Sequence, residues 1–246
     1  MTQPEDGPPS GYAWDNAWGE ARRRLDLLEQ SWDPGSLAYL RGVEPQPGWR
    51  CLDIGAGGGS ITRWLCDAVG PGGTVVSVDL DTRFLALLDV PNLEVVEADV
   101  VTDGLPQGPF DLVHTRAVLM HIPARDRLLA EMVARLRAGG TLVLEEADFH
   151  SLQSAESPLY REFTRQFGEI LHSQAGMDST WGRGLASRLA RLGLKELRCE
   201  ASSTIYPGRS IEAEFYGVTF LQARDLLLAH GIEKEQFDEL LAQLDD

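Results

Sequence analysis

The feature that most constrains this chain is a glycine-rich turn between two apolar stretches. The segment at residues 51–62 reads CLDIGAGGGSIT, and apolar positions such as Leu65 and Val69 follow it at helical spacing. Glycines allow positive φ and let a ligand approach the backbone, and a helix that follows such a turn points its first N–H groups at the ligand. We therefore expect a strand, a turn in which Gly55 and Gly57 contact a nucleotide-like ligand, and a helix.

Two acidic residues help to define this ligand. Asp53 stands just before the glycines, and Asp79 ends the next apolar run at residues 74–78. In dinucleotide-binding folds, an acidic residue some twenty positions after the glycine turn binds ribose hydroxyls. We expect Asp79 to face a ribose and Asp53 to belong to the same site.

The turn DIGAGGGS resembles motif I of the class I S-adenosylmethionine (SAM) methyltransferases, in which an acidic residue precedes the glycines. Further matches at that family's intervals lie at residues 78–79, 98–100, 110–113 and 136–141. The resemblance covers about residues 50 to 150. It implies SAM as the cofactor and an α/β fold with a doubly wound, mainly parallel, Rossmann-like sheet.

The same resemblance assigns further cofactor contacts. Asp99 would accept a hydrogen bond from the adenine amino group, and Val100 would offer its backbone N–H. Leu80 would lie against the adenine ring, and the backbone at Thr115 would pass under the methionine part. Two alternatives stay open, because Asp99 could only cap the next turn and Leu80 could belong to the core.

Two side chains are candidates for catalysis. His121 and Asp148 occupy segments that resemble the sugar O-methyltransferases of indolocarbazole biosynthesis, which use a His and Asp acid/base set. A histidine oriented by a carboxylate suits removal of a hydroxyl proton. The chain departs from that pattern at Met120, where the family has a second histidine. A purely structural hydrogen bond of His121 is the alternative.

The chain divides into four expected regions: an N-terminal tail and helical lid at 1–33, a SAM-binding core at 34–150, a substrate-pocket insertion at 151–192, and a C-terminal strand with helices at 193–246. In the lid, Tyr12, Trp14 and Asn16 are candidates to touch a ligand, and Arg24 could pair with the cofactor's carboxylate. The alternative is that the aromatic side chains only dock this segment on the core.

Strands are expected at 50–54, 74–79, 93–96, 110–114 and 141–146, with a sixth inside 194–206 and no apolar run left for a seventh. Parallel pairing follows from the alternation with helices. Expected helices lie at 34–41, 60–69, 81–88, 125–136, 158–171, 184–192, 211–229 and 233–244. The first of these would begin at Pro34 after an Asp33 cap. Glycines 139 and 140 would end the helix at 125–136.

Composition excludes several classes of partner. A formal net charge of −16 disfavours nucleic acid, whose binding depends on Lys and Arg. No apolar stretch approaches the roughly 20 residues of a membrane span, and no signal-peptide core is visible, so we expect a cytoplasmic protein. No metal is expected, because Glu145, Glu146 and Asp148 span a strand end where neighbours face opposite ways. A metal-dependent catechol-type enzyme is the alternative.

The function expected from these features is methyl transfer from SAM to a small molecule, most simply a hydroxyl of a secondary metabolite. A helix bearing Tyr160, Phe163 and Phe167 could pack on the domain or line a pocket for an apolar or aromatic substrate. Alternatives are a cyclase or isomerase that binds SAM without transfer, an N- or C-methyltransferase that works by alignment without a base, and a non-catalytic subunit. An unpaired sheet edge would favour a homodimer.

Overall fold

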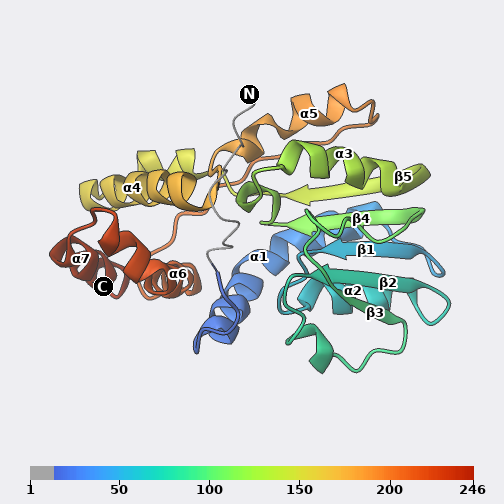
Figure 1. The fold of residues 1–246 in the computed structure, drawn as a ribbon, viewed down its shortest axis with the longest axis horizontal. Helices are drawn as coiled ribbons and strands as arrows, with labels where there is room; N and C mark the ends of the chain where they lie inside the picture. Colours follow the sequence, from blue (N-terminus) through green and yellow to red (C-terminus); the bar gives the residue numbers. More distant parts are fainter. Residues whose placement is uncertain (1–13) are drawn as a thin grey trace, which may run out of the picture.

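A five-stranded parallel sheet forms the centre of the computed structural model, which describes residues 14–246 (Figure 1). The strand order is β3-β2-β1-β4-β5, and every neighbouring pair is parallel. This confirms the α/β, doubly wound, Rossmann-like fold.

The strands are β1 (Arg50–Ile54), β2 (Thr74–Asp79), β3 (Leu93–Glu97), β4 (Phe110–Arg116) and β5 (Leu136–Glu145). The helices are α1 (Ala21–Val43), α2 (Ser60–Val69), α3 (Arg125–Arg135), α4 (Pro158–Ala175), α5 (Leu185–Arg191), α6 (Ile211–Ala229) and α7 (Lys234–Leu244). Short 3₁₀ turns are η1 (Leu85–Leu87), η2 (Leu119–His121), η3 (Phe149–Ser154) and η4 (Trp181–Gly184).

Each face of the sheet is covered by its own helices, because successive side chains of a strand point to opposite faces. Cys51 packs with α1 and α2 on one face. Leu52, its neighbour in β1, packs with α3 and α5 on the other. Both faces are buried, which explains why β1, β2 and β4 read as almost continuous apolar runs.

A separate helical layer lies beyond the carboxyl ends of the strands. Helices α4, α6 and α7 share a core rich in aromatic side chains, which Trp14 also joins. In Figure 1 the arrowhead of β5 points toward this layer. No helix in the described range is both long enough and apolar enough to cross a bilayer.

The expected helix at 34–41 is wrong as a separate element, because α1 runs through Pro34 without a break. A proline inside a helix removes one hydrogen bond and crowds the preceding turn. Tertiary contacts hold the helix together across this point: Ser36 donates to Glu145 at 2.8 Å, and Arg116 donates to Asp33 at 2.7 Å. The boundary expected after residue 33 therefore falls inside one helix.

Three other expectations are also wrong. The expected helix at 81–88 contains only the three-residue turn η1. Gly139 and Gly140 lie inside β5, which begins directly after α3, so they cap no helix. Residues 194–206 form no strand, and within residues 14–246 the sheet has five strands instead of six. Ile205 and Leu197 in that segment are 99% and 40% exposed, so these side chains lack the burial that would stabilise a strand there.

Candidate functional site

The glycine turn follows β1 at the carboxyl edge of the sheet, as expected. Gly55 and Gly57 have φ of 67° and 56°, which glycine adopts without strain. A side chain on Gly55 would collide with Val118, so its absence lets the segment after β4 approach the turn. The Gly55 N–H donates to the Val78 carbonyl at 2.8 Å and fixes the turn against β2.

Asp79 connects β2 to this turn. Its Oδ2 accepts the Gly57 N–H at 2.8 Å, and its Oδ1 accepts the Asp81 N–H at 3.1 Å. Burial raises the pKa of Asp79, while the backbone donors lower it. A carboxylate has about four lone-pair sites, so Asp79 keeps acceptor capacity for ribose hydroxyls. That contact remains a prediction.

The expected adenine contacts lie at the ends of β2 and β3. Leu80 is 54% exposed, which rules out a fully buried core position and leaves a free apolar surface. Asp99 Oδ1 accepts the Val101 N–H at 2.8 Å, so Asp99 does cap its own turn. The roles of Asp99 and Val100 toward adenine stay predictions.

Asp53 is fully buried and belongs to a polar network inside the sheet. Its carboxylate accepts from Thr62 Oγ1 at 2.6 Å and pairs with His114 Nδ1 at 2.7 Å. His114 Nε2 contacts Glu145 at 3.2 Å. Burial lowers the pKa of His114, but Asp53 and Glu145 outweigh it and raise the pKa to about 9. The imidazole is therefore charged at neutral pH, and these bonds engage both Asp53 oxygens.

His114 and Glu145 were not identified as site residues from the sequence. A histidine inside the apolar run FDLVHTR was the available signal, since an unpaired polar group is costly in a buried strand. Thr115, the next residue, is also buried, and its hydroxyl donates to the Ile54 carbonyl at 3.0 Å. This bond joins the ends of β4 and β1 beside the glycine turn. The expectation that the backbone at Thr115 passes under the methionine part of the cofactor stays a prediction.

Helix α1 crosses the glycine turn. The Leu25 side chain lies 3.4 Å from the position of a Cβ built on Gly57. Glu29 accepts the Ser60 N–H at 3.1 Å, and Asp33 accepts the Ser60 hydroxyl at 3.0 Å. Because Gly59 has no side chain to cap α2, Glu29 supplies the cap from α1. Nothing local in the sequence indicated this contact.

His121 lies on η2 between the sheet edge and the aromatic layer. Burial, followed by the charges of Arg24 and Arg125, lowers the pKa of His121 to about 3. The Trp14 ring meets the imidazole edge-on, with centroids 6.4 Å apart. The Arg24 guanidinium lies over the Trp14 ring, 5.4 Å from the ring centre. The imidazole is neutral in this setting.

Asp148 has a different set of partners from the one expected. Arg183 Nη2 lies 2.8 Å from its Oδ2, and the His150 N–H donates to its Oδ1 at 3.0 Å. Among the contacts of residues 14–246, none joins Asp148 to His121. The proposed catalytic pair therefore remains a prediction, and Arg183 competes for the carboxylate.

Other expected contacts fall in the N-terminal segment. Tyr12 lies outside the described residues. The Asn16 carbonyl accepts from Arg83 at 3.0 Å, and the Asp15 carbonyl accepts from Gln222 at 2.8 Å. The segment before α1 thus bridges the loop after β2 and helix α6.

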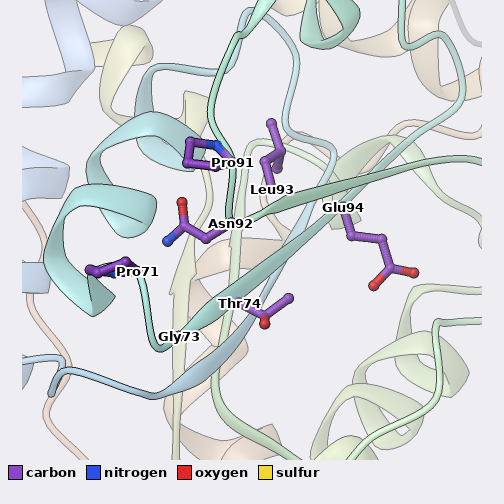
Figure 2. Close-up of a pocket in the computed structure, with 7 residues that line it drawn as sticks. All are labelled: Pro71, Gly73, Thr74, Pro91, Asn92, Leu93 and Glu94. Carbon is purple, nitrogen blue, oxygen red and sulfur yellow. The ribbon is translucent and has the colours of Figure 1, made fainter.

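No cluster of three His, Cys, Asp or Glu side chains suited to a metal occurs within the described part of the chain. A cavity of about 320 Å³ lies elsewhere, at the amino ends of β2 and β3 (Figure 2). Its lining includes Thr74 and Leu93, the first residues of those strands. Ligands of such sheets bind at the carboxyl ends, so this cavity is separate from the glycine-turn site.

The glycine turn and Asp79 lie together at the carboxyl edge of the parallel sheet, where ligands of such folds bind. Residues 52–144 match a protein-family model described as a methyltransferase domain. The chain belongs to the class I SAM-dependent methyltransferases, and SAM is the methyl donor of that family.

Relatives extend this likeness beyond the core. A ubiquinone/menaquinone biosynthesis C-methyltransferase, UbiE, of Pseudomonas syringae pv. tomato is 35% identical over 204 residues, 79% of this chain and 75% of that protein. An uncharacterised 37.1 kDa protein in a Streptomyces fradiae transposon is 34% identical over 188 residues, 74% of this chain. This chain spans 54% of the transposon protein.

Solved structures share the fold. A cyclopropane-fatty-acyl-phospholipid synthase-like protein from Lactobacillus casei superimposes with a TM-score of 0.58 at 17% identity, covering 92% of this chain and 85% of that one. An N-methyltransferase from Haemonchus contortus gives a TM-score of 0.52 at 19% identity, covering 90% of this chain and 47% of its own. At these identities the likeness shows the architecture alone.

Proposed function

We propose that this protein methylates a small, largely apolar molecule at an acidic hydroxyl or at a carbon activated by one. The observation that carries the proposal is the position of His121, which is half-buried between the cofactor edge of the sheet and the aromatic layer. Met120 precedes His121 in the sequence, and Trp14 contacts its ring. Both residues belong to the core of that layer. Apolar surroundings of this kind suit a small organic acceptor.

The residues of the cofactor site fit SAM. Gly55 and Gly57 leave the backbone accessible, Leu80 offers an exposed apolar surface, and Asp79 retains acceptor sites. When bound, SAM supplies an electrophilic methyl group. The protein then contributes mainly alignment, which is worth about 7–11 kcal/mol in well-oriented reactions.

We propose that His121 binds the acceptor by a hydrogen bond and does not remove its proton. With a pKa of about 3, the imidazole is a weak base at neutral pH. Burial is the main cause of this low pKa, and the positive charges of Arg24 and Arg125 lower it further. The same positive charges favour an acceptor in its anionic form. A phenolate or enolate is nucleophilic enough to need no base.

The names of the relatives are compatible with this choice. They include C-methyltransferases and a Burkholderia multivorans O-methyltransferase of ubiquinone biosynthesis, the latter 26% identical over 141 residues. Both name classes concern transfer to carbon or oxygen, which are the two outcomes of attack by a phenolate or enolate.

The test is product analysis with SAM and a panel of hydroxylated aromatic acceptors, matched amines and acceptors without a hydroxyl. We expect S-adenosylhomocysteine and a singly methylated product from the hydroxylated compounds only. Methylation confined to amines would reject the acceptor class. A changed acceptor without S-adenosylhomocysteine would indicate a cyclase or isomerase and reject methyl transfer.

A further inference from the structure

A half-buried carboxylate holds the segment that carries His121. Glu146 directly follows β5, and its Oε1 accepts the Leu119 N–H at 2.8 Å and the Val118 N–H at 3.3 Å. Its Oε2 accepts the Met120 N–H at 3.0 Å. Three successive backbone donors therefore meet one side chain.

The rest of this segment is fixed in the same way. Ala117, at φ 53°, donates its N–H to the Glu145 carbonyl at 2.7 Å. The Met120 carbonyl accepts the Asp178 N–H at 2.8 Å. The end of β5 thus satisfies four consecutive N–H groups, which would be costly to bury without partners.

We propose that Glu146 is a positioning residue for methyl transfer: its carboxylate holds the backbone at 118–120 so that His121 meets the acceptor beside the glycine turn. This inference rests on the proposed function. The bonds to a charged acceptor are stronger than neutral ones. A displaced His121 would lose its hydrogen bond to the acceptor, which reduces the rate by up to about tenfold.

The charges around Glu146 give the proposal a pH signature. Burial raises the pKa of Glu146 to about 7, against the three N–H groups and Arg125, which lower it. Arg125 from α3 is itself 3.3 Å from Asp178, and His121 stays neutral above pH 4 or so because its pKa is about 3. As the pH falls below 7, Glu146 gains a proton and loses acceptor capacity toward the segment. Turnover should fall in the same range.

The experiment compares Glu146→Gln with Glu156→Gln, the same change at an exposed carboxylate. Three quantities are measured on each folded protein: hydrogen exchange of the amides at 118–120, SAM affinity, and turnover from pH 5.5 to 8.5. For Glu146→Gln we expect exchange at 118–120 to accelerate at least tenfold and turnover to fall by up to about tenfold, the most that loss of the His121 hydrogen bond costs. SAM affinity should stay within about threefold, because Asp79 and its turn keep their own bonds.

The pH profile separates positioning from a general structural role. The wild type should lose turnover below about pH 7, and Glu146→Gln should lack that inflection. Glu146→Asp, which keeps the charge, should restore part of the turnover. The wild-type profile needs no variant, so an inflection near pH 7 remains testable if Glu146→Gln does not fold.

Two results would overturn the proposal. One is unchanged exchange at 118–120 in Glu146→Gln, and the other is faster exchange with wild-type turnover. A wild-type profile without an inflection near pH 7 would remove its pH component. If the wild type transfers no methyl group to any acceptor, the proposed function fails instead, and the exchange measurement still reports whether Glu146 holds the segment.

Discussion

Asp53 and Asp79 lie on neighbouring strands, yet their carboxylates have different partners. Asp53 is enclosed by Thr62 and His114, whereas Asp79 bonds to the backbone of the glycine turn. The first contributes to the sheet interior, and the second stands at the ligand edge. A ribose contact is therefore better supported for Asp79 than a direct cofactor contact is for Asp53.

Replacement of Asp79 by alanine should weaken SAM binding by on the order of 2 kcal/mol or more, since both ribose hydroxyls would lose a charged acceptor. The Gly57 N–H would lose its partner as well. Calorimetry on the folded variant measures the change, with Asp67→Ala at an exposed position of α2 as the control. Equal affinities for the two variants would remove Asp79 from the cofactor site.

His121 distinguishes alignment from base catalysis. If it only donates or accepts one hydrogen bond, His121→Ala should reduce turnover about 3- to 10-fold, because such a bond contributes about 0.5–1.5 kcal/mol. Loss of a general base would cost about 10²- to 10⁴-fold. Single-turnover rates with saturating SAM measure the difference, and a loss above 10²-fold would restore the base role.

At the scale of elements, α1 shows how tertiary contacts override a local signal. The sequence Asp33-Pro34-Gly35-Ser36 is typical of a turn or a new helix start. In the fold, Asp33 and Ser36 bond instead to the sheet edge through Arg116 and Glu145. These bonds and the packing of Leu40 on the sheet keep the helix continuous.

Pro34→Ala should stabilise the protein by about 1–2 kcal/mol. Alanine restores the N–H that proline lacks and has a much higher helix propensity, although it also gives the unfolded chain more freedom. Urea unfolding at equilibrium measures the free energy, and Pro47→Ala, in the loop before β1, is the control. A loss of stability in Pro34→Ala would show that the proline ring packs usefully against its neighbours.

For the whole molecule, the buried histidine joins three neighbouring strands. His114 of β4 lies between Asp53 of β1 and Glu145 of β5, and Glu145 also binds α1 through Ser36. Truncating one member of such a network leaves a buried charge without its partner, which typically costs about 3–5 kcal/mol.

The pKa of His114 predicts how stability depends on pH. It rises from an ordinary value of 6.5 to about 9 in the fold, so the folded state holds the proton more tightly. This contribution, about 3 kcal/mol, is fully present below pH 6.5 and is lost as the pH rises through 9. Unfolding free energies from pH 6 to 10 measure it. The decline should persist in His230→Gln, an exposed histidine, and disappear in His114→Gln.

The homodimer, a property of the whole molecule, remains a prediction. β3 and β5 are the edge strands of the sheet within residues 14–246, and unpaired edges favour association. Sedimentation velocity at rising protein concentration should show reversible growth beyond a monomer. A dimer with a micromolar Kd would be excluded if the mass stayed that of a monomer at protein concentrations up to about 100 times that Kd.

The sequence by itself determined the glycine turn, its strand and helix, and the succession of buried strands. These features depend on local chemistry: positive φ at Gly55 and Gly57, and apolar runs long enough for strands buried on both faces. Asp79 could be placed for the same reason, since it ends such a run.

Only the tertiary structure decided which partners the polar side chains have. His114 pairs with Asp53 across 61 residues of sequence, Glu29 caps α2 from another helix, and Arg183 takes the carboxylate of Asp148. The missing sixth strand has the same origin, because 194–206 needs a neighbouring edge and a covering layer to pair and bury its apolar residues. Local sequence patterns do not specify such distant neighbours. Burial of a side chain against these neighbours sets its charge state, and the same contacts decide whether a helix or strand continues.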